Sequence, residues 1–151
     1  MTNLFPAAGL GQRFSQVGYA IPKLMLPVSG KPMIVRALQS APNTKDSVVV
    51  FRTETIRDQH VDQVVHAHDK HICIITTPTP TEGQACTCLL ASDAIDKQAS
   101  LYIGPVDAGM VYDRQKYDKL LREPDTDVIV WAFTQRPTLL RNPKAWGWLR
   151  V

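Results

Sequence analysis

The sequence predicts an α/β protein in which a mostly parallel sheet is covered by helices on both faces, in three Rossmann-like layers. Short, continuous apolar runs recur along the chain, at residues 47–51 (SVVVF) and 71–76 (HICIIT) for example. Such runs are typical of strands that are buried on both faces. Between them lie segments with apolar residues at helical spacing. Strands that alternate with helices in this way form βαβ units, which build a parallel sheet.

The same two patterns predict the order of the elements. An apolar strand opens the chain near Leu4, and Pro32 is well placed to start a helix. Further strands are predicted at 47–51, 71–76, 101–104, 127–133 and 145–151, and helices at 32–41, 54–68, 84–95 and 113–122. Ligands of open parallel sheets bind beyond the carboxyl ends of the strands. We therefore expect the loops that follow the strands to meet at one rim.

Length and composition are those of a single globular domain, residues 1–151, which is long enough to bury a core. Hydrophobic residues make up 44% of the chain and charged residues 21%, the usual balance for a soluble protein. The sequence begins without a signal peptide and holds no long apolar run. We therefore expect a soluble, cytoplasmic protein that does not enter a membrane.

Charge is distributed unevenly along the chain. Five cations precede Asp46, which is the first acidic residue, and all 14 Asp and Glu lie from that position onward. The net charge of +3 is modest, and the basic residues do not spread over a whole face as nucleic-acid binding requires. The early cations are Arg13, Lys23, Lys31, Arg36 and Lys45.

A glycine loop lies within this acid-free stretch, at residues 6–13 (PAAGLGQR). Glycine allows a positive φ and lets a ligand approach bare backbone N–H groups. Free amides beside cations favour phosphate binding. A dinucleotide fingerprint would need a glycine where Phe14 stands, and a P-loop would need Ser or Thr in place of Pro32. A flexible surface loop would explain the glycines but not the charge segregation.

The stretch resembles the signature of nucleotidyltransferases that activate sugar phosphates. That signature runs strand, small-Ala-Gly-x-Gly-x-Arg, a variable loop, Pro-Lys, and then Leu-x-Pro-Val-x-Gly-Lys-Pro-Met. Arg13, the pair Pro22-Lys23 and residues 26–33 (LPVSGKPM) fit it position by position. Several fixed spacings make this match far more specific than a single glycine motif. The resemblance implies the three-layer nucleotidyltransferase fold.

Several site residues are implied by the resemblance within this stretch. Arg13 and Lys23 would be the catalytic residues, steadying the phosphates as their charge changes during transfer. The nucleoside would lie against the backbone of the glycine loop. The residues implied there are Ala7, Ala8, Gly9 and Gly11. Gln12 departs from the pattern, because many relatives place Thr or Ser there.

The loop that enters the predicted helix at 84–95 resembles the family's base-reading loop. Thr81 and Gly83 would contact the nucleotide there, with Gly83 allowing close approach. An ordinary loop with Thr81 as the helix N-cap explains the residues nearly as well. Pro78 replaces a glutamine that some relatives carry, so the base preference stays open between pyrimidines and purines.

Two further residues complete the implied site. Asp107 follows the predicted strand at 101–104, where relatives keep an aspartate that binds Mg²⁺, although a lone Asp at such a place is otherwise a turn residue. Gly147, between two tryptophans, resembles a strand that touches the sugar, and core packing around a bulge is an equal alternative.

Cysteine and histidine give weaker signals. Three cysteines suit a reducing compartment, and we expect Cys73, Cys86 and Cys88 to be core thiols. His66, His68 and His71 are spaced so that their side chains diverge, so we expect solvated residues and no metal cluster.

The resemblance implies the reaction of a nucleoside triphosphate with a sugar 1-phosphate, or a related phosphate, to give a sugar nucleotide and pyrophosphate, with Mg²⁺ as cofactor. It covers the chain end to end but corresponds to the amino-terminal part of the family's domain. We therefore expect a fold that is incomplete at its C-terminus, with nucleotide binding, slow turnover and an apolar end that favours a homo-oligomer. The alternative is a non-catalytic nucleotide-binding or regulatory module. A glycosyltransferase comes third, because such enzymes usually place two aspartates at the metal.

Overall fold

The computed structural model describes residues 1–11, 14, 16–133 and 150. It divides the chain into two compact units, Met1–Val111 and Tyr112–Val151, which are described separately. Arg13, Gly147 and nearly all of the strand predicted at 145–151 lie outside the described residues.

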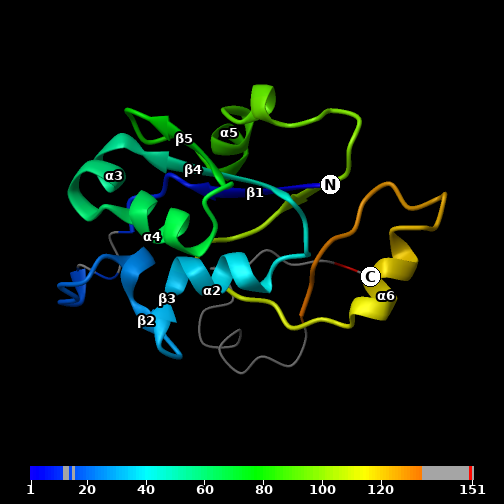
Figure 1. Cartoon of the computed structure of the whole chain (residues 1–151), viewed down its shortest axis with the longest axis horizontal. Coiled ribbons are helices and arrows are strands. Elements are labelled where there is room, and N and C mark those ends of the chain that lie inside the picture. Colours follow the sequence, from blue (N-terminus) through cyan, green and yellow to red (C-terminus); the bar gives the residue numbers. More distant parts are fainter. Residues whose placement is uncertain (12–13, 15, 134–149, 151) are drawn as a thin grey trace. The chain divides into compact units, whose positions relative to one another are not determined.

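The first unit contains a four-stranded sheet in which every neighbouring pair is parallel (Figure 1). Its order is β5-β4-β1-β6, so the first strand lies inside the sheet. The strands are β1 (Thr2–Ala7), β4 (Asp46–Arg52), β5 (Cys73–Thr77) and β6 (Leu101–Ile103). The predicted α/β class with a mostly parallel sheet is confirmed.

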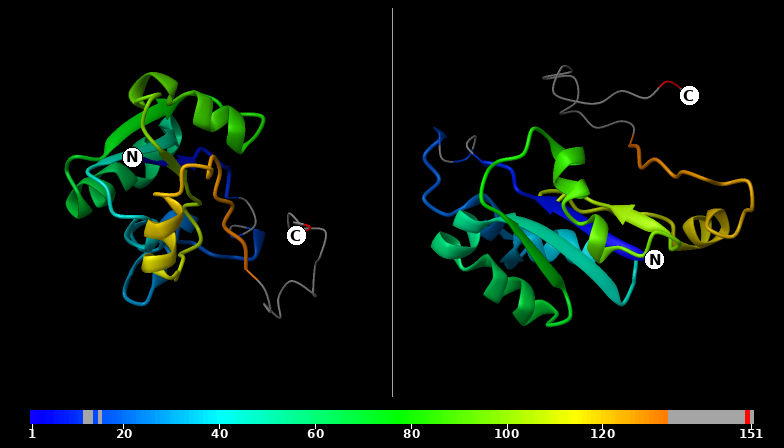
Figure 2. Two further views of the ribbon diagram at one scale, coloured as in Figure 1. Left: turned by 90° about the vertical axis from the view of Figure 1, so that its right-hand side faces the viewer. Right: turned by 90° about the horizontal axis from the view of Figure 1, so that it is seen from above.

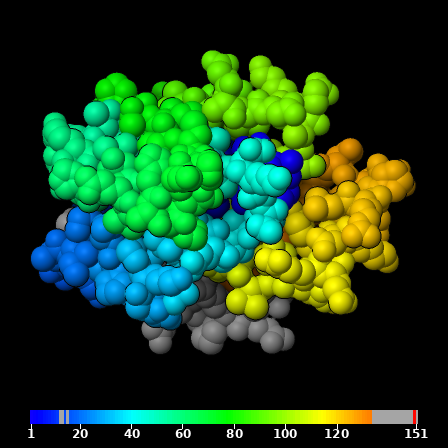
Figure 3. All heavy atoms as spheres, viewed as in Figure 1, coloured from blue at the N-terminus to red at the C-terminus, as the bar shows by residue number. Residues whose placement is uncertain are grey.

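Helices lie on both faces of this sheet (Figures 1 and 2). One face carries α5 (Gln84–Leu89), and the side chains of Leu4, Val48 and Val50 pack there around Ala91. The opposite face carries α2 (Met33–Ser40) and α4 (Val61–His68), which form a continuous surface in Figure 3. Side chains alternate along a strand, so the neighbouring residues of β1 and β4 point to this second face. These are Phe5, Val49 and Phe51, each at most 1% exposed.

Two predicted helices differ in the structure. The helix predicted at 54–68 is two helices, α3 (Thr53–Gln59) and α4, separated by His60 in the left-handed conformation with φ 50°. Histidine visits that region more readily than most residues, and its N–H still bonds to Ile56 O at 3.0 Å. The helix predicted at 84–95 ends as α5 at Leu89, and a 3-10 turn, η2 (Ser92–Ala94), follows.

The strand β5 is less buried than its apolar sequence predicts, because it forms an edge of the sheet. Cys73 at its start is exposed, so the expectation of a core thiol is wrong for this residue. Cys86 and Cys88 on α5 are half-buried. Burial raises the pKa of the Cys88 thiol, which keeps it protonated and inert.

A small hairpin connects β1 to α2. Its strands, β2 (Pro27–Val28) and β3 (Lys31–Pro32), are antiparallel, and Ser29 and Gly30 make the turn with φ 48° and 78°. Two positive φ values are what a tight two-residue hairpin turn requires. Arg36 of α2 donates to the carbonyls of Val28 and Ser29, which fixes the hairpin on the helix.

In the second unit, α6 (Arg114–Leu120) begins after Asp113, whose side chain accepts from the Lys116 N–H at 3.1 Å. This agrees with the helix predicted at 113–122. The strand predicted at 127–133 is wrong, since these residues lie outside any strand. Val128 and Val130 are 77% and 61% exposed. The rings of Tyr112, Tyr117 and Trp131 lie 5.0–5.5 Å apart.

Of the helices within the described residues, none is long and apolar enough to cross a membrane.

Candidate functional site

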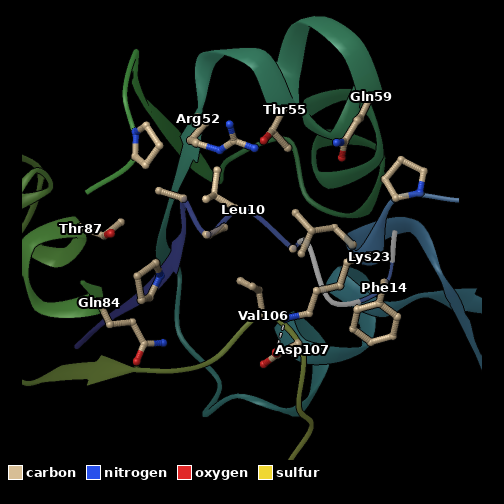
Figure 4. Close-up of a pocket in the computed structure, with 18 of the residues that line it drawn as sticks. Leu10, Phe14, Lys23, Arg52, Thr55, Gln59, Gln84, Thr87, Val106 and Asp107 are labelled. Atoms are coloured by element: carbon tan, nitrogen blue, oxygen red, sulfur yellow. Dashed lines mark hydrogen bonds and ion pairs between the residues drawn. The ribbon is translucent and has the colours of Figure 1, made fainter. Parts of the chain in front are cut away.

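A pocket of about 610 Å³ opens at the carboxyl edge of the sheet (Figure 4). This volume is in the range of small-molecule sites. Each of the four strands contributes the segment that follows its carboxyl end, as expected for a parallel sheet. The lining residues are 6–11 at the end of β1 and in the loop behind it, Arg52 at the end of β4 with Thr55 and Gln59 on α3, Pro80, Thr81, Gly83, Gln84 and Thr87 after β5, and Val106 with Asp107 after β6.

The structure brings together most of the residues that the sequence singles out. The pocket is lined by Ala7, Ala8, Gly9, Gly11, Lys23, Thr81, Gly83 and Asp107. Arg13 and Gly147 lie outside the described residues. Two of the early cations lie outside the pocket. Lys31 Nζ is 3.4 Å from Gln39 Oε1, and Arg36 holds the hairpin on α2. The acid-free stretch therefore does not focus all of its charge on one site.

The glycine loop continues directly from β1. Ala7 and Ala8 are 4% and 3% exposed, so the start of the loop is anchored in the core. Gly11 has φ 64°, a conformation that favours glycine, and a Cβ there would lie 3.6 Å from Lys23 Cβ. Gly11 thus brings the loop backbone close to the lysine.

Lys23 stands at the start of a short 3-10 turn, η1 (Lys23–Met25). The next residue, Leu24, and then Leu26 are buried, so apolar packing fixes the backbone that carries the lysine. The Lys23 ammonium forms an ion pair with Asp107 and lies 5.9 Å from the centre of the Phe14 ring. Both partners are partly exposed, at 25% and 42% of their side-chain surface, and such pairs contribute little to stability. A ligand can therefore separate them at small cost.

The set of possible metal ligands is small. The described residues contain no group of three or more His, Cys, Asp and Glu side chains that could hold a metal ion. Asp107 offers a single carboxylate to the pocket. A magnesium ion bound by one carboxylate takes its other ligands from water and phosphate oxygens. The residues of the pocket therefore fit Mg²⁺ only when it arrives with a phosphate ligand.

The loop before α5 is held by hydroxyl groups. Thr81 Oγ1 lies 2.6 Å from Thr87 Oγ1 and 3.1 Å from the Gly83 carbonyl oxygen, which also accepts from Thr87 at 3.2 Å. The helix begins after Gly83, and no described side chain caps it, so the alternative interpretation of Thr81 as N-cap is wrong. A Cβ on Gly83 would meet no described heavy atom within 4 Å. The space beside this glycine opens to the pocket.

One side of the pocket is missing from the sequence interpretation. Arg52 ends β4, and Thr55 and Gln59 follow it on α3. The rule that ligands lie beyond strand ends would have found Arg52, because it directly follows the run 47–51. Leu10 and Phe14 also line the pocket with apolar side chains, and no sequence pattern singled them out.

A parallel sheet with a pocket beyond the carboxyl ends of its strands places the chain in the class of open α/β domains that bind their ligands at this edge. Residues 4–147 match the MobA-like NTP transferase domain. The chain belongs to this family.

Two individual relatives were found in addition. A UTP–glucose-1-phosphate uridylyltransferase of Pseudomonas aeruginosa is 40% identical over 62 residues, which are 39% of this chain and 22% of that protein. The crystal structure of a nucleoside-diphosphate-sugar pyrophosphorylase from Vibrio cholerae superimposes with a TM-score of 0.57 at 23% identity. That match covers 77% of this chain and 52% of the other, and it supports the fold alone.

Proposed function

We propose that this chain is a nucleotidyltransferase domain that joins a nucleoside triphosphate to a sugar 1-phosphate, or a related phosphate, with release of pyrophosphate. The observation that carries the proposal is the pairing of Lys23 with Asp107 in the pocket beside the glycine loop. A cation for phosphate and a carboxylate for a metal thus lie together where the strands end. Membership of the family and the name of the Pseudomonas aeruginosa relative support the same activity.

In this reaction an oxygen of the sugar phosphate attacks the α-phosphorus of the nucleotide. The bond between the α-phosphorus and the oxygen that bridges to the β-phosphate breaks, and pyrophosphate leaves. The substrate supplies its own nucleophile, so the protein acts by positioning and by charge stabilisation. The nucleoside would lie against Ala7, Ala8 and Gly9, between Gly83 and Gly11, with its phosphates toward Lys23.

The ion pair of the unliganded pocket gives each partner a role on binding. The Lys23 ammonium would turn from Asp107 to the phosphates, and the carboxylate would become free to hold Mg²⁺. The metal would neutralise the charge that builds up on the phosphates during transfer. Arg13 is proposed as a second phosphate contact and Gly147 as a contact to the sugar.

A pyrophosphate-release assay with Mg²⁺ tests the proposal across several nucleoside triphosphates and sugar 1-phosphates. We expect release that requires both substrates and that is lost in Asp107→Asn. Mg²⁺-dependent nucleotide binding without release under any pairing would contradict transferase activity and would favour a nucleotide-binding module. Release that persists unchanged in Asp107→Asn would remove Asp107 from the site.

A further inference from the structure

Arg52 lies in the pocket without a part in the phosphate chemistry. It is the last residue of β4, and its side chain is 13% exposed. Figure 4 shows it beside Thr55, on the side of the pocket away from Asp107. A mostly buried cation at this place calls for a partner.

The contacts of Arg52 leave one edge of its guanidinium group for a ligand. Nη1 forms an ion pair with Glu54, which holds the group in place. The Nε–H is buried and has no partner within the described part of the chain. A buried donor without a partner is unfavourable, and an acceptor on a ligand would restore its hydrogen bond. Nε and Nη2 lie on the same edge of the planar group, so this edge presents a fork of two parallel donors.

We propose that Arg52 reads the nucleobase in this pocket and selects bases with carbonyl acceptors over adenine. The proposal rests on the nucleotide site proposed above. Guanidinium has five donors and no acceptor, so it pairs with the O6 and N7 of guanine, the O2 and N3 of cytosine, or a carbonyl of uracil. Adenine places an amino donor beside each of the acceptors on its two hydrogen-bonding edges. That amino group would face the donors of Arg52.

The position of Arg52 favours the base over the phosphates as its ligand. The cation for phosphate and the carboxylate for a metal, Lys23 and Asp107, already lie together on the other side. Near Arg52 lies Leu10 (Figure 4), and Arg52 pairs in register with Thr77, the last residue of β5, so the loop that carries Pro80 and Thr81 into the pocket lining starts beside it. Such walls suit a flat, uncharged ring better than a triphosphate, which keeps much of its charge in water.

Calorimetry with GTP, CTP, UTP and ATP in the presence of Mg²⁺ tests this assignment on the full chain. Wild-type protein should bind ATP most weakly. Its dissociation constant for ATP should exceed that for the best nucleotide by about 10- to 100-fold, the range expected for one hydrogen bond to a charged group. Arg52→Met should remove this difference, because it should weaken the binding of GTP, CTP and UTP and leave the affinity for ATP nearly unchanged.

Three control variants separate selectivity from folding and from charge. Arg57→Met removes an exposed cation of α3 that is paired with Asp58 and lies outside the pocket, and it should leave all four affinities unchanged. Glu54→Gln removes the charge that holds Arg52 and should weaken the preference only in part. If Arg52→Met does not fold, Arg52→Lys keeps the charge without the fork, and the preference should still fall.

The results distinguish this inference from the proposed function. Equal affinity of the wild type for ATP and the other three nucleotides would overturn the inference and leave the nucleotide site intact. Equal weakening of all four by Arg52→Met would also overturn it, because a phosphate or folding role has that effect. Failure of every triphosphate to bind would overturn the proposed function itself.

Discussion

Two apolar runs of this chain have nearly the same sequence character and different structures. Residues 46–52 (DSVVVFR) form β4, an inner strand whose Val49, Val50 and Phe51 are fully buried. Residues 127–133 (DVIVWAF) form no strand, and Val128 and Val130 are largely exposed. A strand requires a hydrogen-bonded partner, and an inner strand requires two partners and cover on both faces, none of which an apolar run provides by itself. β1 and β5 supply the two partners of β4, and the helices cover both faces of the sheet (Figure 1).

The largest expected effect comes from the same substitution in the two runs. Val49→Asp places a carboxylate without a partner in the core, which costs as much as the whole stability of a typical domain, about 5–15 kcal/mol. Val130→Asp places it on the surface, with an expected change within about 0.5 kcal/mol. Circular dichroism and thermal unfolding measure both. Loss of folding in both variants would show that 127–133 is also a core strand.

An intermediate effect on stability is expected where a side chain is added to a glycine that is packed against a neighbouring ring. A Cβ on Gly104, just after β6, would lie 2.5 Å from the ring of Tyr102, whereas a Cβ on Gly9 would meet no described atom within 4 Å. Gly104→Ala should destabilise the protein by about 1–3 kcal/mol, because the buried tyrosine must move. Gly9→Ala is the control, with a smaller change in the unfolding midpoint. Equal midpoints for the two variants would contradict the packing around Tyr102.

The smallest effect on stability is expected at Gly83, although its effect on binding is large. Its φ of 177° is extended backbone that any residue adopts, and open space surrounds it among the described residues. Gly83→Val should therefore unfold at nearly the wild-type temperature and lose nucleotide affinity, because its side chain occupies the pocket. Thermal unfolding and calorimetry on the same sample measure both. A folded variant with unchanged affinity would make Gly83 an ordinary turn residue.

Much of the fold and part of the site could be predicted from the sequence. Continuous apolar runs and apolar residues at helical spacing predicted β4, α2 and the parallel sheet, because these segments bury the residues that the patterns mark as apolar. The motif singled out Lys23, and the place after a strand together with the family resemblance singled out Asp107; the two residues are 84 positions apart and in contact. The break at His60 rests on one backbone conformation that no pattern specifies. The exposure of β5 depends on its place at the sheet edge, and the role of Arg36 at the hairpin depends on a fold that brings carbonyls to it.

The central claim is that Lys23 binds the phosphates of a nucleotide in this pocket. Calorimetry with a nucleoside and its triphosphate, each with Mg²⁺, tests it on Lys23→Ala, with Lys31→Ala as the matched control outside the pocket. Lys23→Ala should weaken binding of the triphosphate by about 10- to 100-fold, the value of one charge-assisted hydrogen bond, and leave the affinity for the nucleoside unchanged. Lys31→Ala should change neither. Equal weakening of both ligands in Lys23→Ala, or no weakening of the triphosphate, would contradict the account.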